Sequence, residues 1–216
     1  MSGVYETVSA IKKAKIVAIA RGLDEGQIRP VAKALIAGGI KAMEVTFNTP
    51  GAPKMIEILS NEFSSELLVG AGTVLDPKTA ATAASCGAKF VLSPVTDISV
   101  INECKRLGVV SVPGAMTPTE IFAAWQAGAG MVKVFPAGTL GPKYIADLLA
   151  PLNDLSLMAV GGISLENVAR FFSFGAHAVG IGSDLLNKRM IASGDYSALE
   201  RQAALFTAAA AKPERT

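Results

Sequence analysis

The sequence predicts an α/β fold, because strand-like and helix-like segments alternate along its 216 residues. The strand-like runs are almost continuously apolar, as expected of parallel strands that are covered on both faces. Eight such runs in one chain favour a single closed (β/α)8 TIM barrel. An open, doubly wound sheet is the alternative, although its Gly-x-Gly-x-x-Gly pattern does not follow the first run.

An amphipathic stretch precedes the first strand-like run, and it predicts an extra N-terminal helix and not a signal peptide. No linker or low-complexity segment divides the chain, so we expect one domain over residues 1–216. In chain order, the predicted strands are Ile16–Arg21, Ala42–Phe47, Leu67–Thr73, Phe90–Pro94, Val109–Pro113, Met131–Pro136, Leu155–Gly161 and Ala178–Ser183.

Helix signals lie between the predicted strands. Asp76-Pro77 and Thr117-Pro118 each combine an N-cap residue with proline at the first helical position, and Glu120 completes a capping box with Thr117. Ser164 is expected to cap a helix that begins at Leu165. Glycine then ends four similar helical patterns directly before an apolar run, where it can adopt the left-handed conformation that terminates helices. These corners are Gly38-Gly39, Gly87-Ala88, Gly128-Ala129 and Gly175-Ala176.

The composition excludes several classes of protein. Half of the residues are hydrophobic and 18% are charged, which excludes a disordered chain. The net charge is +2 with no basic run, so we expect no nucleic-acid partner. No apolar stretch reaches about 18 residues, so we expect no membrane partner. Cys86 and Cys104 are too few for a disulfide framework, which favours a cytoplasmic location.

The chain contains a single histidine, His177. One imidazole excludes a zinc site built from several histidines, and the absence of a Gly-x-Ser-x-Gly motif argues against a serine hydrolase triad. His177 directly precedes the last predicted strand and is interpreted as structural. Chemistry in this chain must therefore depend mainly on Lys, Glu, Asp, Arg, Ser or Thr.

Two predicted strands each contain one full charge, Glu44 and Lys133. Lys133 lies between Val132 and Val134, and side chains alternate along a strand. The two valines suit the layer that packs against helices, so Lys133 is expected to point into the barrel, as is Glu44 by the same reasoning.

An isolated buried charge is costly, so two interpretations are open. Lys133 and Glu44 could form a structural ion pair. Alternatively, they belong to an active site, because both approach the C-terminal ends of their strands, where barrels of this kind carry their active sites. A desolvated lysine loses its proton more easily, and the free amine attacks carbonyl groups. Glu44 could then move protons during turnover.

Other predicted strand ends carry groups that could bind a substrate. Arg21 ends the first strand and could hold a carboxylate, although an arginine there is often only surface charge. Thr73 ends the third strand after Gly70-Ala71-Gly72 and supplies a hydroxyl, although the glycines could instead mark a bend.

Glycine-rich turns follow the last two predicted strands. Gly161 and Gly162 follow the seventh strand, and the run Gly180-Ile181-Gly182-Ser183-Asp184 follows the eighth. Backbone N–H groups in these two loops commonly bind phosphate in (β/α)8 barrels. A single Gly-Gly turn is weak evidence, but two glycine-rich turns in this pair of loops favour a phosphate site.

Together these motifs resemble the 2-keto-3-deoxy-6-phosphogluconate (KDPG) and 4-hydroxy-2-oxoglutarate (KHG) aldolases. The resemblance extends over nearly the whole chain, and the matching segments occur in the order of that family. They are Glu44-Val45-Thr46, the run from Gly70 to Leu75, the run from Val132 to Ala137, Gly161-Gly162-Ile163 and Gly182-Ser183.

The resemblance implies a class I aldolase, a homotrimer that needs no metal or cofactor and acts on a small phosphorylated keto acid. It would cleave a 2-keto-3-deoxy-6-phospho sugar acid to pyruvate and glyceraldehyde 3-phosphate. Lys133 matches the Schiff-base lysine and Glu44 the proton-transferring carboxylate of the family. The substrate-contacting positions of the family match Arg21, Thr73, Phe135, Gly161, Gly162, Gly182 and Ser183.

Two departures concern the substrate. Asn48 stands where KDPG-specific members often have arginine, and Ala159-Val160 stands where they often have Pro-Thr. With Arg21, these residues resemble the branch that acts on the galactonate epimer, KDPGal. Three alternatives stay open: an aldolase mainly for KHG, a sugar-phosphate isomerase or epimerase, and a non-catalytic sugar-phosphate-binding barrel.

Overall fold

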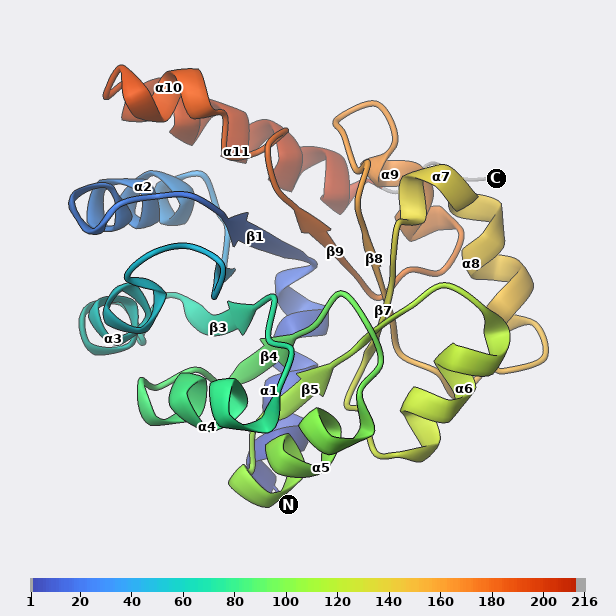
Figure 1. Cartoon of the computed structure of the whole chain (residues 1–216). Helices are drawn as coiled ribbons and strands as arrows, with labels where there is room; N and C mark the ends of the chain where they lie inside the picture. Colours follow the sequence, from blue (N-terminus) through green and yellow to red (C-terminus); the bar gives the residue numbers. More distant parts are fainter. Residues whose placement is uncertain (1, 213–216) are drawn as a thin grey trace.

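Nine parallel strands surround a central axis in residues 2–212, the part of the chain that the computed structural model describes, and helices lie outside them (Figure 1). Residues 1 and 213–216 of the predicted domain lie outside the described residues. The strands are β1 (Ile16–Ala20), β2 (Ala42–Thr46), β3 (Leu68–Gly72), β4 (Phe90–Leu92), β5 (Val110–Val112), β6 (Gly114–Ala115), β7 (Val132–Val134), β8 (Leu157–Val160) and β9 (Ala178–Ile181).

The strands form a ladder in the order β5-β4-β3-β2-β1-β9-β8-β7-β6. Its two ends follow each other in the chain, with only Pro113 between β5 and β6. Proline has no N–H to donate, and it separates β5, which lies within the predicted fifth strand Val109–Pro113, from β6, which lies beyond that strand. β5 pairs with β4, β6 pairs with β7, and the carbonyl of Pro113 accepts a hydrogen bond from Lys133 N (2.9 Å). The predicted (β/α)8 barrel is confirmed, with a bent fifth strand.

The helices follow the predicted alternation, and the predicted N-terminal helix is present. They are α1 (Ser2–Ala14), α2 (Glu25–Ala37), α3 (Ala52–Glu62), α4 (Pro77–Ser85), α5 (Ile98–Leu107), α6 (Pro118–Gln126), α7 (Ala137–Leu140), α8 (Pro142–Leu149), α9 (Val168–Ser173), α10 (Lys188–Ala192) and α11 (Tyr196–Ala211).

Two of the three predicted N-caps are confirmed. The Asp76 side chain accepts from Thr79 N, and Thr117 forms a complete capping box with Glu120. The prediction for Ser164 is wrong, because α9 begins only at Val168. Asn167 is the reason: its Oδ1 accepts from Ser164 N and its Nδ2 donates to the carbonyl of Gly162. These bonds hold residues 164–167 in a turn before the helix starts.

The barrel interior is packed at the N-terminal end of the strands. Inward-facing apolar side chains, among them Phe90, Val110 and Met131, form an inner cluster that is separate from the layer between strands and outer helices. α1 passes across this end and buries Ile11 completely in the inner cluster (Figure 1). Val132 and Val134 belong to the outer layer, as predicted.

None of the helices in residues 2–212 is both long and apolar enough to cross a lipid bilayer.

Replacing Ile11 with alanine tests the contribution of α1. Deleting a buried side chain of this size costs about 2–5 kcal/mol, because the contacts are lost and a cavity is left. We expect Ile11→Ala to lower the free energy of unfolding by that amount, as measured by urea denaturation. Tyr5→Ala is the matched control on the same helix, because the Tyr5 side chain is 75% exposed. Its cost should stay within about 0.5 kcal/mol, and equal effects of both variants would contradict the packing role of α1.

Candidate active site

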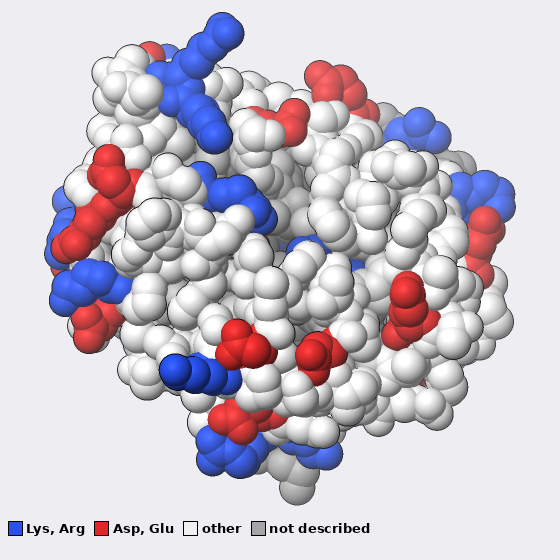
Figure 2. All heavy atoms as spheres, viewed as in Figure 1, with Lys and Arg blue, Asp and Glu red and all other residues white. Residues whose placement is uncertain are grey.

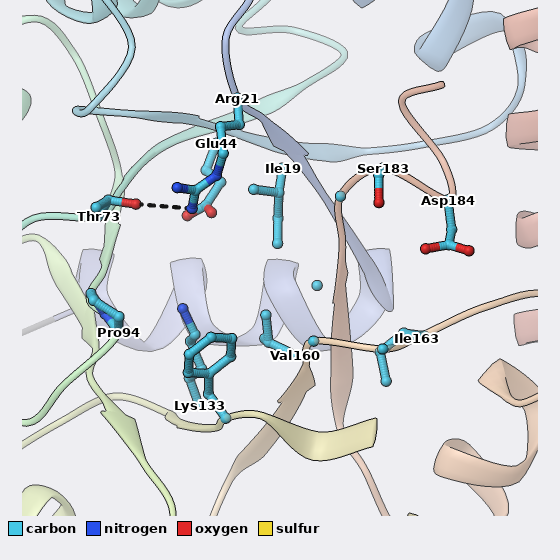
Figure 3. A pocket seen from close by; sticks show the side chains of 15 residues that line it. Ile19, Arg21, Glu44, Thr73, Pro94, Lys133, Val160, Ile163, Ser183 and Asp184 are labelled. Carbon is cyan, nitrogen blue, oxygen red and sulfur yellow. Dashed lines mark hydrogen bonds between the residues drawn. The ribbon is translucent and has the colours of Figure 1, made fainter. Parts of the chain in front are cut away.

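A cavity of about 360 Å³ opens at the C-terminal ends of the strands, and its size suits a small molecule. Figure 2 shows this face of the molecule hollowed at its centre, with basic side chains at and within the hollow. All nine site residues that the sequence predicts line this one cavity (Figure 3). They are Arg21, Glu44, Thr73, Lys133, Phe135, Gly161, Gly162, Gly182 and Ser183.

Lys133 lies on β7 and lines the cavity together with Phe135. Only 7% of Lys133 is exposed, and its Nζ lies 4.7 Å from the centre of that ring. Burial lowers the pKa of Lys133, Glu44 opposes this effect, and Arg21 adds to it. The site thus favours the neutral amine more than water does.

Glu44 lies on β2 and is 2% exposed. Burial raises the pKa of this carboxyl to about 7, although the charges of Lys133 and Arg21 oppose the shift. Its Oε2 atom is buried without a hydrogen-bond partner among the described residues. The described part of the chain contains no direct ion pair between Glu44 and Lys133, so the structural-pair interpretation is not supported.

Gly72 makes room for the carboxylate of Glu44. A Cβ atom on Gly72 would lie 2.5 Å from Cδ and from both carboxylate oxygens, which is shorter than any real contact of this kind. The carboxylate therefore lies directly against the backbone of β3. Any side chain at position 72 would have to displace it.

Arg21 and Thr73 face each other across the mouth of the cavity (Figure 3). Arg21 Nη2 donates to Thr73 Oγ1 at 3.3 Å. Thr73 has a φ of 57°, a left-handed conformation that is rare for a β-branched residue and is typically retained where the surrounding structure imposes it. The loop after Arg21 is fixed by Gly22 N, which donates to Thr49 Oγ1 at 2.9 Å. The guanidinium and the hydroxyl could together hold a carboxylate.

The glycine-rich turns form the opposite end of the cavity. Gly161 and Gly162 have φ angles of 88° and 72°, which only glycine adopts without strain. A Cβ atom on Gly161 would also lie 3.1 Å from the ring of Phe135. In the second turn, the carbonyl of Gly182 accepts from both Leu185 N and Leu186 N.

Sequence reasoning missed part of the cavity lining. Alternation along β1 and β8 could have identified Ile19 and Val160, because both lie on the inward face. Gly180 and Asp184, in the predicted glycine-rich turn after the eighth strand, also line the cavity. The lining residues that were not predicted are Ile19, Pro94, Val160 and Ile163.

Within residues 2–212, no three or more His, Cys, Asp or Glu side chains are grouped so that they could hold a metal ion. His177 lies at the other end of the barrel, where its Nδ1 accepts from Leu157 N at 3.3 Å. That position agrees with the structural interpretation of the single histidine.

The chain is similar to proteins of one family. The family model described as KDPG and KHG aldolase matches residues 7–202. A 2-dehydro-3-deoxy-6-phosphogalactonate aldolase of Escherichia coli (strain K12) is 35% identical over 80% of this chain and 85% of the relative. A 2-dehydro-3-deoxy-phosphogluconate aldolase of Treponema pallidum (strain Nichols) is 36% identical over 91% of this chain and 92% of the relative.

Solved structures of KDPGal and KDPG aldolases have the same fold as this chain. The structure described as native KDPGal has a TM-score of 0.84 and 33% identity, covering 90% of this chain and 93% of the other. The KDPG aldolase from Legionella pneumophila, with pyruvate captured at low pH as a covalent carbinolamine intermediate, has a TM-score of 0.84 and 26% identity. It covers 93% of this chain and 96% of the other.

Because the carboxyl of Glu44 is buried, the free energy of unfolding should depend on pH. Its pKa of about 7 in the folded chain lies above its ordinary value of 4.5, so the folded state binds the proton more tightly than the unfolded state does. The native chain should therefore lose stability as the pH rises from 4.5 through 7. Glu44→Gln has no proton to lose and should escape this loss.

Urea denaturation between pH 4.5 and pH 9 measures the effect. The difference in free energy of unfolding, Glu44→Gln minus the native chain, should increase across this range by an amount on the order of 3 kcal/mol. It should level off above pH 8. Parallel pH profiles for the two proteins would show that the carboxyl titrates normally.

Proposed function

Since this chain belongs to the KDPG and KHG aldolase family, we propose that it cleaves a 2-keto-3-deoxy-6-phospho sugar acid, KDPG or its epimer KDPGal, to pyruvate and glyceraldehyde 3-phosphate. Relatives that carry either name are lyases, and the chain covers at least four fifths of those described above. One observation of the site carries the proposal: a buried lysine and a buried carboxyl share a cavity without pairing to each other.

In the proposed first step, the neutral amine of Lys133 attacks the C2 ketone of the substrate. The carbinolamine that forms takes up a proton from the solvent and loses water to give a protonated imine, which withdraws electrons from the C3–C4 bond. The lowered pKa of Lys133 supports this role, since only the free amine is nucleophilic. The Legionella pneumophila relative, in which pyruvate is held as a covalent carbinolamine, supports it independently.

Glu44 is proposed to move the protons. A carboxyl with a pKa of about 7 can both accept and donate a proton near neutral pH. It would take the proton of the C4 hydroxyl, directly or through water, while the C3–C4 bond breaks and the electron pair moves into the imine. Glyceraldehyde 3-phosphate then leaves, Glu44 returns the proton to C3 of the enamine, and hydrolysis releases pyruvate from Lys133.

The remaining predicted residues are proposed to hold the two ends of the substrate. Arg21 and Thr73 would bind the carboxylate, since a guanidinium and a hydroxyl both donate hydrogen bonds to it. Phe135 would pack beside the keto acid. The phosphate would lie at Gly161, Gly162, Gly182 and Ser183.

The assembly is proposed from exposed apolar side chains, and the location from the cysteines. Several large apolar side chains near the open end of the barrel are exposed, which supports burial in a homotrimer. They include Leu75, Val95, Ile98, Met116 and Phe122. Cys86 and Cys104 are both unpaired, which supports the cytoplasm.

The alternative functions predict release of pyruvate from different compounds. An assay coupled to lactate dehydrogenase would compare KDPG, KDPGal and KHG. Asn48 and Ala159-Val160 support KDPGal as the preferred substrate, whereas fastest cleavage of KHG would favour the KHG alternative. An isomerase or a non-catalytic binding barrel would release no pyruvate from any of them.

Borohydride reduction tests the role of Lys133. Reduction in the presence of pyruvate should fix a covalent adduct on this side chain, because borohydride reduces an imine to a stable amine. Peptide mass spectrometry should find the added mass on Lys133 and on no other lysine. Lys133→Met should lose both the adduct and activity, whereas Lys143→Met should retain both, because Lys143 is exposed on α8. An adduct on a different lysine would overturn the assignment.

Proton exchange at the methyl group of pyruvate tests Glu44. Exchange with heavy water requires a base to remove a methyl proton from the imine and return deuterium. Glu44→Gln should fold, still form the reducible adduct on Lys133, and lose at least about 100-fold in exchange rate, as measured by proton NMR. An unchanged exchange rate with an intact adduct would remove Glu44 from the mechanism.

A further inference from the structure

Two buried threonine hydroxyls are paired at the C-terminal end of β2. Thr46 is the last residue of this strand, and Thr49 lies in the loop that follows it. Thr46 is completely buried, Thr49 is 3% exposed, and their Oγ1 atoms share a hydrogen bond at 2.9 Å. Neither residue lines the cavity, so direct contact with a substrate does not explain why two hydroxyls are buried here.

Thr49 connects this pair to the loop after β1. Its Oγ1 accepts from Gly22 N at 2.9 Å, and a hydroxyl that accepts one hydrogen bond can still form another with Thr46. Gly22 directly follows Arg21 and has a φ of 72°, so the chain turns in a left-handed conformation at this point. The bond to Thr49 therefore fixes the backbone immediately after Arg21.

Thr46 lies beside the segment that carries Thr73. In the register of β2 and β3, Thr46 is paired with Gly72, which directly precedes Thr73. The next residue of the loop, Phe47, donates from its backbone N to Gly72 O at 2.7 Å. Residues 46–49 thus join two backbone segments, one carrying Arg21 and the other carrying Thr73.

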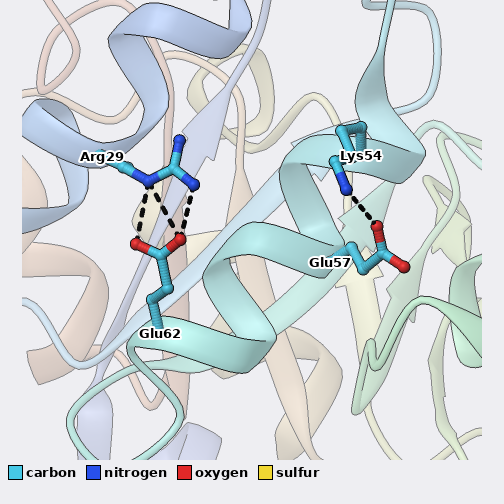
Figure 4. A network of polar contacts seen from close by, with 4 residues as sticks. All are labelled: Arg29, Lys54, Glu57 and Glu62. Carbon is cyan, nitrogen blue, oxygen red and sulfur yellow. Dashed lines mark hydrogen bonds and ion pairs between the residues drawn. The ribbon is translucent and has the colours of Figure 1, made fainter.

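The Arg21 side chain itself is only weakly held. Its bond to Thr73 Oγ1 is 3.3 Å long, beyond the usual range for such bonds (Figure 3). Arg29 on α2 is fixed by an ion pair with Glu62, whereas no ion pair of the described residues includes Arg21 (Figure 4). Arg21 is exposed, so its free side chain has many rotamers, and its placement depends on the backbone at its base.

We propose that Thr49 is a positioning residue for the carboxylate end of the substrate: its hydroxyl, paired with that of Thr46, holds the guanidinium of Arg21 against Thr73. The proposal rests on the aldolase activity proposed above. Thr49 acts through Arg21 and does not touch the reacting atoms. Its loss should therefore weaken binding of the keto acid and leave attack by Lys133 almost unchanged.

Thr49→Val tests this role, because it keeps the shape of the side chain and leaves Gly22 N without its partner. Methyl exchange of pyruvate in heavy water, followed by proton NMR, gives KM and kcat. The KM of pyruvate should increase about tenfold. The kcat should change by less than about threefold, as expected when only uniform binding is lost. An unchanged KM, or a loss confined to kcat, would overturn the inference.

Two further variants keep the test independent of folding defects. Thr49→Ser retains the hydroxyl and should restore the native KM; a KM as high as that of Thr49→Val would contradict a role of the hydroxyl. Thr46→Val removes the other hydroxyl of the pair and serves if Thr49→Val fails to fold. It should also raise the KM of pyruvate, and an unchanged value would overturn the inference.

A double-mutant cycle separates positioning from a general loss of stability. Arg21→Met leaves no guanidinium to position, so adding Thr49→Val to it should raise the KM of pyruvate by less than about threefold. A full tenfold increase in that background would show that Thr49 does not act through Arg21.

Thr207→Val is the matched control. Thr207 lies on α11, and its Oγ1 donates to Gly38 O at 2.9 Å, so it also joins two elements through a hydroxyl and a backbone group. It does not line the cavity. Its loss should lower stability in urea and leave the KM of pyruvate unchanged within about twofold. An increase as large as that of Thr49→Val would contradict a specific role of Thr49.

The affinity for oxalate, measured by calorimetry, gives a readout without turnover, because oxalate has a carboxylate and no ketone for Lys133 to attack. Thr49→Val should bind oxalate about tenfold more weakly than the native chain. If the native chain forms no reducible adduct with pyruvate, the aldolase proposal fails, and the oxalate affinities alone decide the role of Thr49. Equal affinities in the two proteins would overturn the inference.

Discussion

The structure depends on keeping two ionisable groups out of water without letting them neutralise each other. Lys133 and Glu44 point into the barrel from β7 and β2, and both are almost fully buried. Desolvation disfavours the charged form of each group. Because they form no direct ion pair among the described residues, the cost of burial acts on both pKa values. That cost favours the free amine of Lys133 and gives the Glu44 carboxyl a pKa of about 7, which are the states that the proposed mechanism needs.

The rest of the fold maintains this arrangement. α1 and the inner apolar cluster fill the N-terminal end of the barrel, so apolar side chains lie beneath Lys133 and Glu44. Gly72 lets the Glu44 carboxylate lie against the backbone of β3, and the carbonyl of Pro113 holds β7 through Lys133 N. Burial of the two groups is thus a property of the whole barrel.

The two ends of the cavity serve different purposes. The end with Arg21 and Thr73 contains donors suited to a carboxylate, which agrees with the keto acid substrates named for members of this family. The other end is lined by the glycine turns and Ser183. Relatives named for either epimer match the chain at 35% and 36% identity, so overall similarity does not decide which substrate fits best.

The sequence by itself determined the elements and the direction of their side chains. The eight strand positions, the N-terminal helix and the inward orientation of Lys133 follow from local patterns, because a strand repeats every two residues and a cap involves only a few neighbours. The nine predicted site residues could be assembled for the same reason, since the ends of parallel strands meet at one end of a barrel, and the family resemblance supplied their proposed roles.

Only the tertiary structure decided how those residues face one another. The contact between Gly72 and the Glu44 carboxylate depends on the register between β2 and β3, which pairs Thr46 with Gly72 and which no single-strand pattern contains. The separation of Lys133 from Glu44 is likewise set across the barrel, by how all the strands close and not by any one of them.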